Sequence, residues 1–340
     1  MSAALARTLL RPPAVIVKRT TRNRWEVDGE RLDPAMQHVF AMAKIVQRSM
    51  PAMGHVRARR YYEMMCKILD EPPIEVFQTR DLQFETRAGV RAARAYYPCP
   101  GEKAPCLVYI HGGGHTIGSI RTHDAFCRRL AVASECVVVS IDYRLAPEDP
   151  FPAAPEDCYD VYLSLLDRSQ ELRIDPARVA VGGDSAGGNL STTVAAMVRE
   201  SGAPAPRLQL LIYPAVGGIN HEGRQNPGLQ RHYGLDAETT HWFTEKYVQD
   251  ADYRDPGVAP LYLDTHQGLP PAVIVTAHFD LLCREGLEYV QVLESAGVPV
   301  THLHYRDLPH GFATMSCVPR ARAAIEEIGA TLGAHLSACD

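Results

Sequence analysis

The sequence lacks the features that mark several classes of protein. Its formal charge of -5 leaves no surplus of basic residues to neutralise nucleic-acid phosphates, so we expect no nucleic-acid partner. No apolar run approaches the ~20 residues that a membrane-spanning helix needs. Nine cysteines include no C-x-x-C pair, and several lie in apolar runs, which favours reduced core residues and a cytoplasmic protein.

The composition is that of a globular chain with a sizeable core, because 46% of its 340 residues are hydrophobic and 22% are charged. The first 24 residues differ, since they hold six Lys or Arg and no acidic residue. They lack the apolar run and cleavage pattern of a secretory signal, so we expect a helical arm. A targeting sequence, or an arm that touches lipid, stays open as an alternative.

Apolar spacing predicts helices over residues 34–69. The pattern then changes to two extended segments, "EVFQTRDLQFE" and "VRAARAYYP", which Ala88-Gly89 separates. This arrangement indicates an antiparallel pair at the edge of a sheet. We therefore expect an N-terminal helical segment over residues 1–70 and a main α/β domain over residues 71–340.

Within the main domain, short apolar runs alternate with helical stretches. The runs are continuously apolar, which suits parallel strands that helices cover on both faces. The expected strands are 106–111, 136–143, 178–183, 208–214, 272–280 and 300–307. The expected helices are 122–134, 153–169, 187–200, 284–296 and 319–337. This order predicts a doubly wound α/β fold, and the polar stretch 217–268 is typical of an inserted lid or cap.

The stretch "GGDSAGG" at residues 182–188 joins a predicted strand to a predicted helix, where a glycine-rich turn can hold a phosphate or present a nucleophile. A phosphate loop of the Walker type needs a lysine at the position where Gly188 or Asn189 stands. No register gives the dinucleotide pattern G-x-G-x-x-G. The stretch does fit G-x-S-x-G, which predicts Ser185 as a nucleophile on a strained turn.

Three features elsewhere in the chain support the nucleophile. "HGGG" follows an earlier predicted strand, 74 residues before Ser185. Asp280 ends a predicted strand 95 residues after Ser185, and His310 lies in the loop "DLPHGF" after the next strand. The order Ser, Asp, His is that of the α/β-hydrolase arrangement. We predict a triad in which His310 takes the serine proton and Asp280 orients the imidazole.

Five motifs in order, "HGGGHTIGS", "DYRLAPEDPFPAA", "GGDSAGGNL", "DLLCREG" and "HGF", resemble the hormone-sensitive lipase family of α/β-hydrolases, the bacterial family IV esterases. The resemblance spans roughly residues 71–338. It implies an α/β-hydrolase fold whose mostly parallel central sheet has helices on both faces, with residues 71–340 as the catalytic domain. Residues 1–70 and 217–268 would then form a helical cap.

The resemblance also implies site residues and an assembly. The backbone N–H groups of Gly113, Gly114 and Ala186 would form the oxyanion hole. The family often dimerises through its last strand region, here residues 300–307, although a monomer stays open.

The chain departs from the family at two places, since His115 stands where the family usually carries an aromatic residue, and Leu281 and Cys283 replace the usual Pro and Arg. We expect four side chains to line the substrate pocket: His115, Tyr213, Trp242 and Phe243. No metal site is expected, because the spacing of His111 and His115 would need a helix that the intervening glycines disfavour.

These observations predict a serine carboxylesterase that hydrolyses short- to medium-chain acyl esters without a cofactor. The preference for chain length is implied by the resemblance alone. Acyl transfer or amide hydrolysis by the same triad stays open. A non-catalytic small-molecule receptor on a hydrolase fold is a third reading, since a fold does not dictate a function.

Overall fold

The computed structural model describes residues 23–43, 49–218 and 233–337, together with residues 17, 21, 228 and 229. The strands are β1 (Glu26–Val27), β2 (Glu30–Arg31), β3 (Gln78–Thr86), β4 (Gly89–Tyr97), β5 (Ala104–Ile110), β6 (Val137–Ile141), β7 (Ile174–Asp184), β8 (Gln209–Ile212), β9 (Ala272–Phe279) and β10 (Val300–Pro309). The helices are α3 (Pro34–Ala43), α4 (Met50–Met53), α5 (His55–Leu69), α6 (Ile120–Ser134), α7 (Ala153–Asp167), α8 (Ser169–Leu172), α9 (Ala186–Ser201), α10 (Ala237–Val248), α11 (Cys283–Ser295) and α12 (Pro319–Ser337), with short 3-10 turns η2 (Pro260–Tyr262) and η3 (Phe312–Thr314). Most of the expected N-terminal arm lies outside the described residues, as does part of the 217–268 insertion.

Eight strands form one sheet in the order β10-β9-β8-β7-β5-β6-β4-β3. Strands β3, β4 and β6 pair antiparallel, and all other pairs are parallel. The doubly wound α/β fold and the antiparallel pair at the sheet edge are therefore confirmed. Strand β7 begins earlier than expected, at Ile174, because Ile174 pairs with Ala104 before an irregularity in the register.

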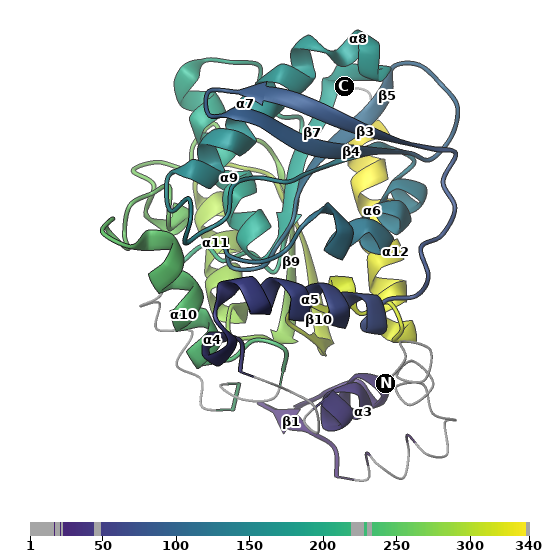
Figure 1. Cartoon of the computed structure of the whole chain (residues 1–340), viewed down its shortest axis with the longest axis vertical. Helices are drawn as coiled ribbons and strands as arrows, with labels where there is room; N and C mark the ends of the chain where they lie inside the picture. Colours follow the sequence, from purple (N-terminus) through teal and green to yellow (C-terminus); the bar gives the residue numbers. More distant parts are fainter. Residues whose placement is uncertain are drawn as a thin grey trace.

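Helices cover both faces of the sheet (Figure 1). Leu107 and Tyr109 of β5 share one buried cluster with α6 and α12, while Val108 and Ile110 share another with α7 and α9. Successive side chains of a strand point to opposite faces of the sheet, and here the side chains on both faces are buried. This double burial explains why the core strands are continuously apolar in sequence.

The stretch 34–69, which the apolar spacing predicted to be helical, contains the three helices α3, α4 and α5. Gly54, at φ 73°, separates α4 from α5, in a backbone region that glycine enters without steric cost. Helix α5 crosses the lower end of the sheet in Figure 1, and α10 lies beside it. A small buried cluster of Ala58, Ile117 and Trp242 joins the two helices.

Arg59 makes several of the polar contacts that fasten helix α5 to the main domain. The Arg59 guanidinium donates to the carbonyl oxygens of Thr116 and Ala146, at 2.8 and 2.9 Å. It also makes two hydrogen bonds of 2.7 Å to the Glu148 carboxylate. The bidentate arrangement fixes the direction as well as the distance of the contact.

The crossing of α9 over β5 depends on two glycines. A Cβ at Gly183 would meet the Ile110 carbonyl oxygen and lie 2.6 Å from the Gly187 carbonyl carbon. A Cβ at Gly187 would also meet the Ile110 carbonyl oxygen. Both neighbours are backbone atoms, which cannot turn away as a flexible side chain would.

We predict that Gly187→Ala lowers the free energy of unfolding by about 1–3 kcal/mol, the usual cost of overpacking a dense interior. Urea unfolding measures this change. Gly101→Ala is the matched control, because its Cβ would enter open space. Equal stability of the two variants would contradict the close crossing.

Candidate active site

Ser185 occupies a strained turn between β7 and α9, with φ 55° and ψ -117°. A residue with a side chain seldom adopts a positive φ, so the surrounding structure must hold it there. The Ser185 N–H donates to the Ile212 carbonyl oxygen at 2.8 Å, and its own carbonyl accepts from the Asn189 N–H at 3.1 Å. The strained turn predicted from G-x-S-x-G is therefore present.

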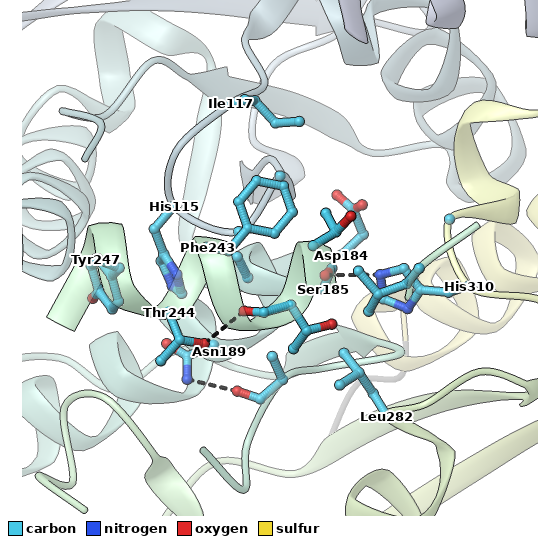
Figure 2. Close-up of a pocket in the computed structure, with 18 of the residues that line it drawn as sticks. His115, Ile117, Asp184, Ser185, Asn189, Phe243, Thr244, Tyr247, Leu282 and His310 are labelled. Atoms are coloured by element: carbon cyan, nitrogen blue, oxygen red, sulfur yellow. Dashed lines mark hydrogen bonds between the residues drawn. The ribbon is translucent and has the colours of Figure 1, made fainter. Parts of the chain in front are cut away.

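The structure brings the three predicted triad side chains together. His310 Nε2 lies 3.0 Å from Ser185 Oγ (Figure 2). His310 Nδ1 lies 2.8 Å from Asp280 Oδ2. Asp280 and His310 directly follow β9 and β10, whose carboxyl ends are neighbours in the parallel sheet. An ionised carboxylate only accepts hydrogen bonds, so the network assigns the proton to Nδ1 and leaves Nε2 to accept from the serine hydroxyl.

Asp280 is itself held in place, because its second oxygen, Oδ1, accepts from the Leu282 N–H at 2.8 Å. Its side chain is buried. The carboxylate can therefore orient one imidazole nitrogen and remain fixed while it does so.

Gly113, Gly114 and Ala186, the residues predicted to form an oxyanion hole, line the same cavity as Ser185. Gly113 and Gly114 have φ values of 119° and 57°, which favour glycine. A Cβ at Gly113 would meet the Ile117 carbonyl oxygen, and a Cβ at Gly114 would meet the ring of Phe243. Both conformation and space therefore require glycine at these positions.

A buried charge pair lies beneath the glycine loop. His123 Nε2 is 3.3 Å from Asp184 Oδ1. Burial by itself would raise the pKa of the Asp184 carboxyl, but the His123 charge and the hydrogen bonds from Tyr109 and Gly112 lower it to about 2. Burial by itself would lower the pKa of His123, but the charge and close approach of Asp184, a hydrogen bond to the Ser119 backbone and the Asp70 charge together raise that pKa.

The cavity in front of Ser185 has a volume of about 160 Å³. Of the four predicted pocket residues, His115 and Phe243 line it (Figure 2). Further lining side chains that the sequence did not single out are Ile117, Asn189, Thr244 and Leu282. Its wall combines apolar groups with a few hydroxyl, amide and imidazole groups, as in most small-molecule sites.

The predictions for Tyr213 and Trp242 were wrong, because neither residue lines the cavity. Tyr213 is fully buried below the site, where its ring packs 4.7 Å from the His310 ring and its hydroxyl accepts from the Ala313 N–H. Trp242 points away from the cavity towards Ala58 of α5, because neighbouring residues on a helix face directions about 100° apart. Phe243, the next residue, does line the cavity.

Asn189 is a structural link that sequence reasoning missed. Its amide nitrogen donates to the carbonyl oxygens of Ala215 and Val258, at 2.7 and 2.8 Å. It thereby ties the first turn of α9 to two loops at the cavity wall. The signal in the sequence was an amide directly after the glycines of "SAGGN", at a position where a helix would otherwise bury an apolar residue.

His115 stacks on Tyr247, with 3.7 Å between ring centres and 7° between the planes. The imidazole of His115 therefore packs as the aromatic residue that the family usually carries at this position would. Burial lowers the pKa of His115 to about 3, although the nearby Asn189 amide opposes the shift. The imidazole is therefore neutral at physiological pH.

Comparison with known proteins identifies the family. A model of the α/β hydrolase fold matches residues 107–314. The carboxylic ester hydrolase LipN of Mycobacterium tuberculosis is 38% identical over 321 residues, which cover 92% of this chain and 85% of that protein. The chain belongs to the hormone-sensitive lipase family of α/β-hydrolases. Carboxylic ester hydrolysis is the activity that this membership supports.

Two further proteins show a comparable similarity to this chain. An ethyl acetate hydrolase of Pseudomonas putida is 34% identical over 84% of this chain and 92% of that protein. A hyperthermophilic esterase from Pyrobaculum calidifontis superposes with a TM-score of 0.83 at 36% identity, covering 89% of this chain and 98% of the esterase. The α/β-hydrolase fold predicted from the motifs is thus confirmed.

We predict that His115→Phe makes the protein less sensitive to acid. Between the ordinary histidine pKa near 6.5 and the folded value of about 3, the unfolded chain binds a proton that the folded chain does not. Stability therefore falls as pH falls through this window. The variant should lose less free energy of unfolding between pH 7 and pH 4, by on the order of 3 kcal/mol.

Urea unfolding at several pH values measures this slope. The control is His241→Gln, which alters an exposed side chain on α10. A slope that His115→Phe leaves unchanged would mean that the imidazole takes up a proton in the folded protein.

Proposed function

We propose that the protein is a serine carboxylesterase that hydrolyses short- to medium-chain acyl esters. The observation that carries the proposal is the continuous hydrogen-bonded array of Ser185, His310 and Asp280, with Ser185 facing a cavity that Gly113 and Gly114 also line. The array supplies a nucleophile, a base and an orienting carboxylate at hydrogen-bond distance.

In the proposed reaction, Ser185 Oγ attacks the ester carbonyl carbon while His310 Nε2 takes the serine proton. The carbonyl electron pair moves to its oxygen, and the N–H groups of Gly113, Gly114 and Ala186 stabilise that oxyanion. The intermediate collapses when His310 returns the proton to the leaving alcohol, which leaves an acyl-enzyme. Water then repeats the sequence with the same base, and the free acid is released.

The cavity supports the proposed preference for short chains. A volume of about 160 Å³ is close to that of an engineered cavity that accommodates benzene, so a long acyl chain would extend into water or displace the surrounding helices. Residues 1–70 and 217–268 would act as a cap, since Met50 and Tyr62 from the first segment and Phe243 from the second line the cavity. The relative named ethyl acetate hydrolase acts, by that name, on a small ester.

The alternatives use the same residues or leave them idle. Acyl transfer would differ only in the nucleophile that attacks the acyl-enzyme, and amide hydrolysis only in the leaving group. A receptor would have no need of a His310 imidazole within 3.0 Å of Ser185 Oγ. We therefore place ester hydrolysis first.

The setting of the enzyme is also proposed. Among the residues that the structure describes, no helix is long and apolar enough to cross a membrane. We propose a cytoplasmic enzyme on its cysteine pattern. Strand β10 lies at one edge of the sheet, and we propose the Val300–Tyr305 part of this edge for the homodimer that the family resemblance implies, since the Asp33 N–H already donates to the Asp307 carbonyl oxygen further along the strand.

The p-nitrophenyl esters of acetate, butyrate, hexanoate and dodecanoate should be hydrolysed with the highest kcat/KM at the shorter chains. The small cavity is the physical reason, because a longer chain leaves methylene groups in water or forces the cap open. Initial rates over a range of concentrations give the profile. A maximum at dodecanoate would refute the proposed chain length.

Ser185→Ala should lower kcat by about 10⁴-fold or more, the usual loss when a triad nucleophile is removed. A serine-directed organophosphate should add one phosphoryl mass to the wild-type peptide that contains Ser185. Ser201→Ala is the matched control, because it changes a serine at the far end of α9 that donates only to the Val198 carbonyl. Full activity in Ser185→Ala, or labelling elsewhere, would reject the mechanism.

A further inference from the structure

His123 of α6 is a fully buried histidine that the proposed reaction does not use. Its Nδ1 hydrogen-bonds Thr122 Oγ1 at 2.8 Å, and its Nε2 faces Asp184 Oδ1 at 3.3 Å. Within the described part of the chain, no contact of His123 Nε2 meets hydrogen-bond geometry, the 3.3 Å approach to Asp184 included. What His123 offers Asp184 is therefore charge.

Asp184 connects the two halves of the site. It directly precedes Ser185, and its Oδ1 accepts hydrogen bonds from the Gly112 N–H at 2.8 Å and from the Tyr109 hydroxyl. Gly112 is the first glycine of the loop that continues into Gly113. A Cβ at Gly112 would lie 2.7 Å from the Asp184 carbonyl oxygen, so the loop and the nucleophile turn are in direct contact.

A buried carboxylate such as Asp184 needs a compensating charge, because its loss of hydration is costly.

Four other titratable groups face or lie near His123. These are His111, stacked at 5.7 Å, the phenol rings of Tyr109 and Tyr62 at 6.0 and 6.5 Å, and the Asp70 carboxyl.

His123 supplies the compensating charge. Burial and the charge of His123 lower the pKa of His111 to about 4, so His111 is neutral. Burial raises the phenol pKa values of Tyr62 and Tyr109 well above their ordinary range. Asp184 raises the pKa of His123, so within this cluster the positive charge is favoured on His123, opposite the Asp184 carboxylate.

We propose that His123 is a positioning residue for the oxyanion hole. Protonated His123 keeps Asp184 ionised, and ionised Asp184 holds the Gly112 N–H and with it the loop that presents the N–H groups of Gly113 and Gly114. The inference rests on the proposed function, because the hole matters only if an oxyanion forms. His123 does not touch the substrate. Its charge acts on transition-state binding through Asp184, the residue next to Ser185.

This role differs from that of an ordinary structural contact. Asp184 Oδ1 already has two hydrogen-bond donors without His123. A neutral side chain of similar size at position 123 would preserve packing and remove the charge. The loss should then appear in the transition state, where the oxyanion develops, more than in substrate binding.

The test is His123→Gln in the full-length protein, with p-nitrophenyl butyrate as substrate. We expect kcat to fall about 10-fold, less than the 10²- to 10³-fold cost of deleting an oxyanion-hole donor, with KM changed less than about twofold. A trifluoromethyl ketone forms a hemiketal oxyanion on the catalytic serine. Its Ki should rise by the same factor by which kcat/KM falls.

His266→Gln is the matched control, since His266 is also a buried histidine but hydrogen-bonds the Pro260 carbonyl, and it does not line the cavity. It should leave both kcat and Ki unchanged. A His123→Gln protein that has a lower melting temperature but an unchanged Ki would overturn the proposal, because the residue would then be merely structural.

Asp184→Asn tests the same pair if His123→Gln does not fold, because an amide keeps an oxygen for the Gly112 N–H while it removes the charge. Parallel losses of kcat and ketone affinity support the proposal, and an unchanged Ki overturns it. A different result would refute the proposed function itself: a wild-type protein that hydrolyses no ester and is not labelled by the organophosphate at Ser185.

Discussion

The closest backbone approach in the site sets the conditions for the rest. Strand β5 ends at Ile110, and its carbonyl oxygen lies against the α-carbons of Gly183 and Gly187, where a methyl group would not fit. This contact lets α9 start directly above the sheet and forces Ser185 into its positive φ. The half-buried nucleophile faces the cavity because the strand and the helix on either side of it pack against the end of β5.

Parallel strands then assemble the site from distant parts of the chain. Ile110, Asp184, Phe279 and Pro309 each end a strand at the same edge of the sheet, and the residues that follow them are the ones that meet. Because each connection passes through a helix, these residues are far apart in sequence and cannot adjust to one another locally. Hydrogen bonds hold them in position instead. Asp280 accepts from the Leu282 N–H, Asp184 accepts from the Gly112 N–H, and the Ser185 N–H donates to the Ile212 carbonyl oxygen.

The sequence predicted the strands, the glycine turn and the three reacting side chains because each leaves a local pattern. Continuous apolar runs report burial on two faces, and G-x-S-x-G reports a steric limit. The pocket wall leaves no such pattern, so Trp242 and Phe243 looked equivalent although only one faces the cavity. The direction of a side chain around a helix depends on what packs against the helix, and Ala58 of α5, which packs with Trp242, lies 184 residues earlier in the chain.

Two other features were not predicted from the sequence, for related reasons. The hairpin of β1 and β2 turns at Asp28-Gly29, a dipeptide that suits two successive positive φ values, but its strands have only two residues each and show no alternation. The charge pair of His123 and Asp184 joins a helix to a strand end 61 residues later. A lone histidine in an amphipathic helix gives no sign of its partner.

The contact between Phe243 and Gly114 has a consequence for selectivity. The ring occupies the space that a side chain on Gly114 would fill, so this wall of the cavity is also the outer support of the glycine loop. A substrate that pushes the ring aside to gain room loosens the groups that must later receive negative charge. Oversized substrates would therefore still bind and yet turn over slowly, and the discrimination would lie in the rate of acylation.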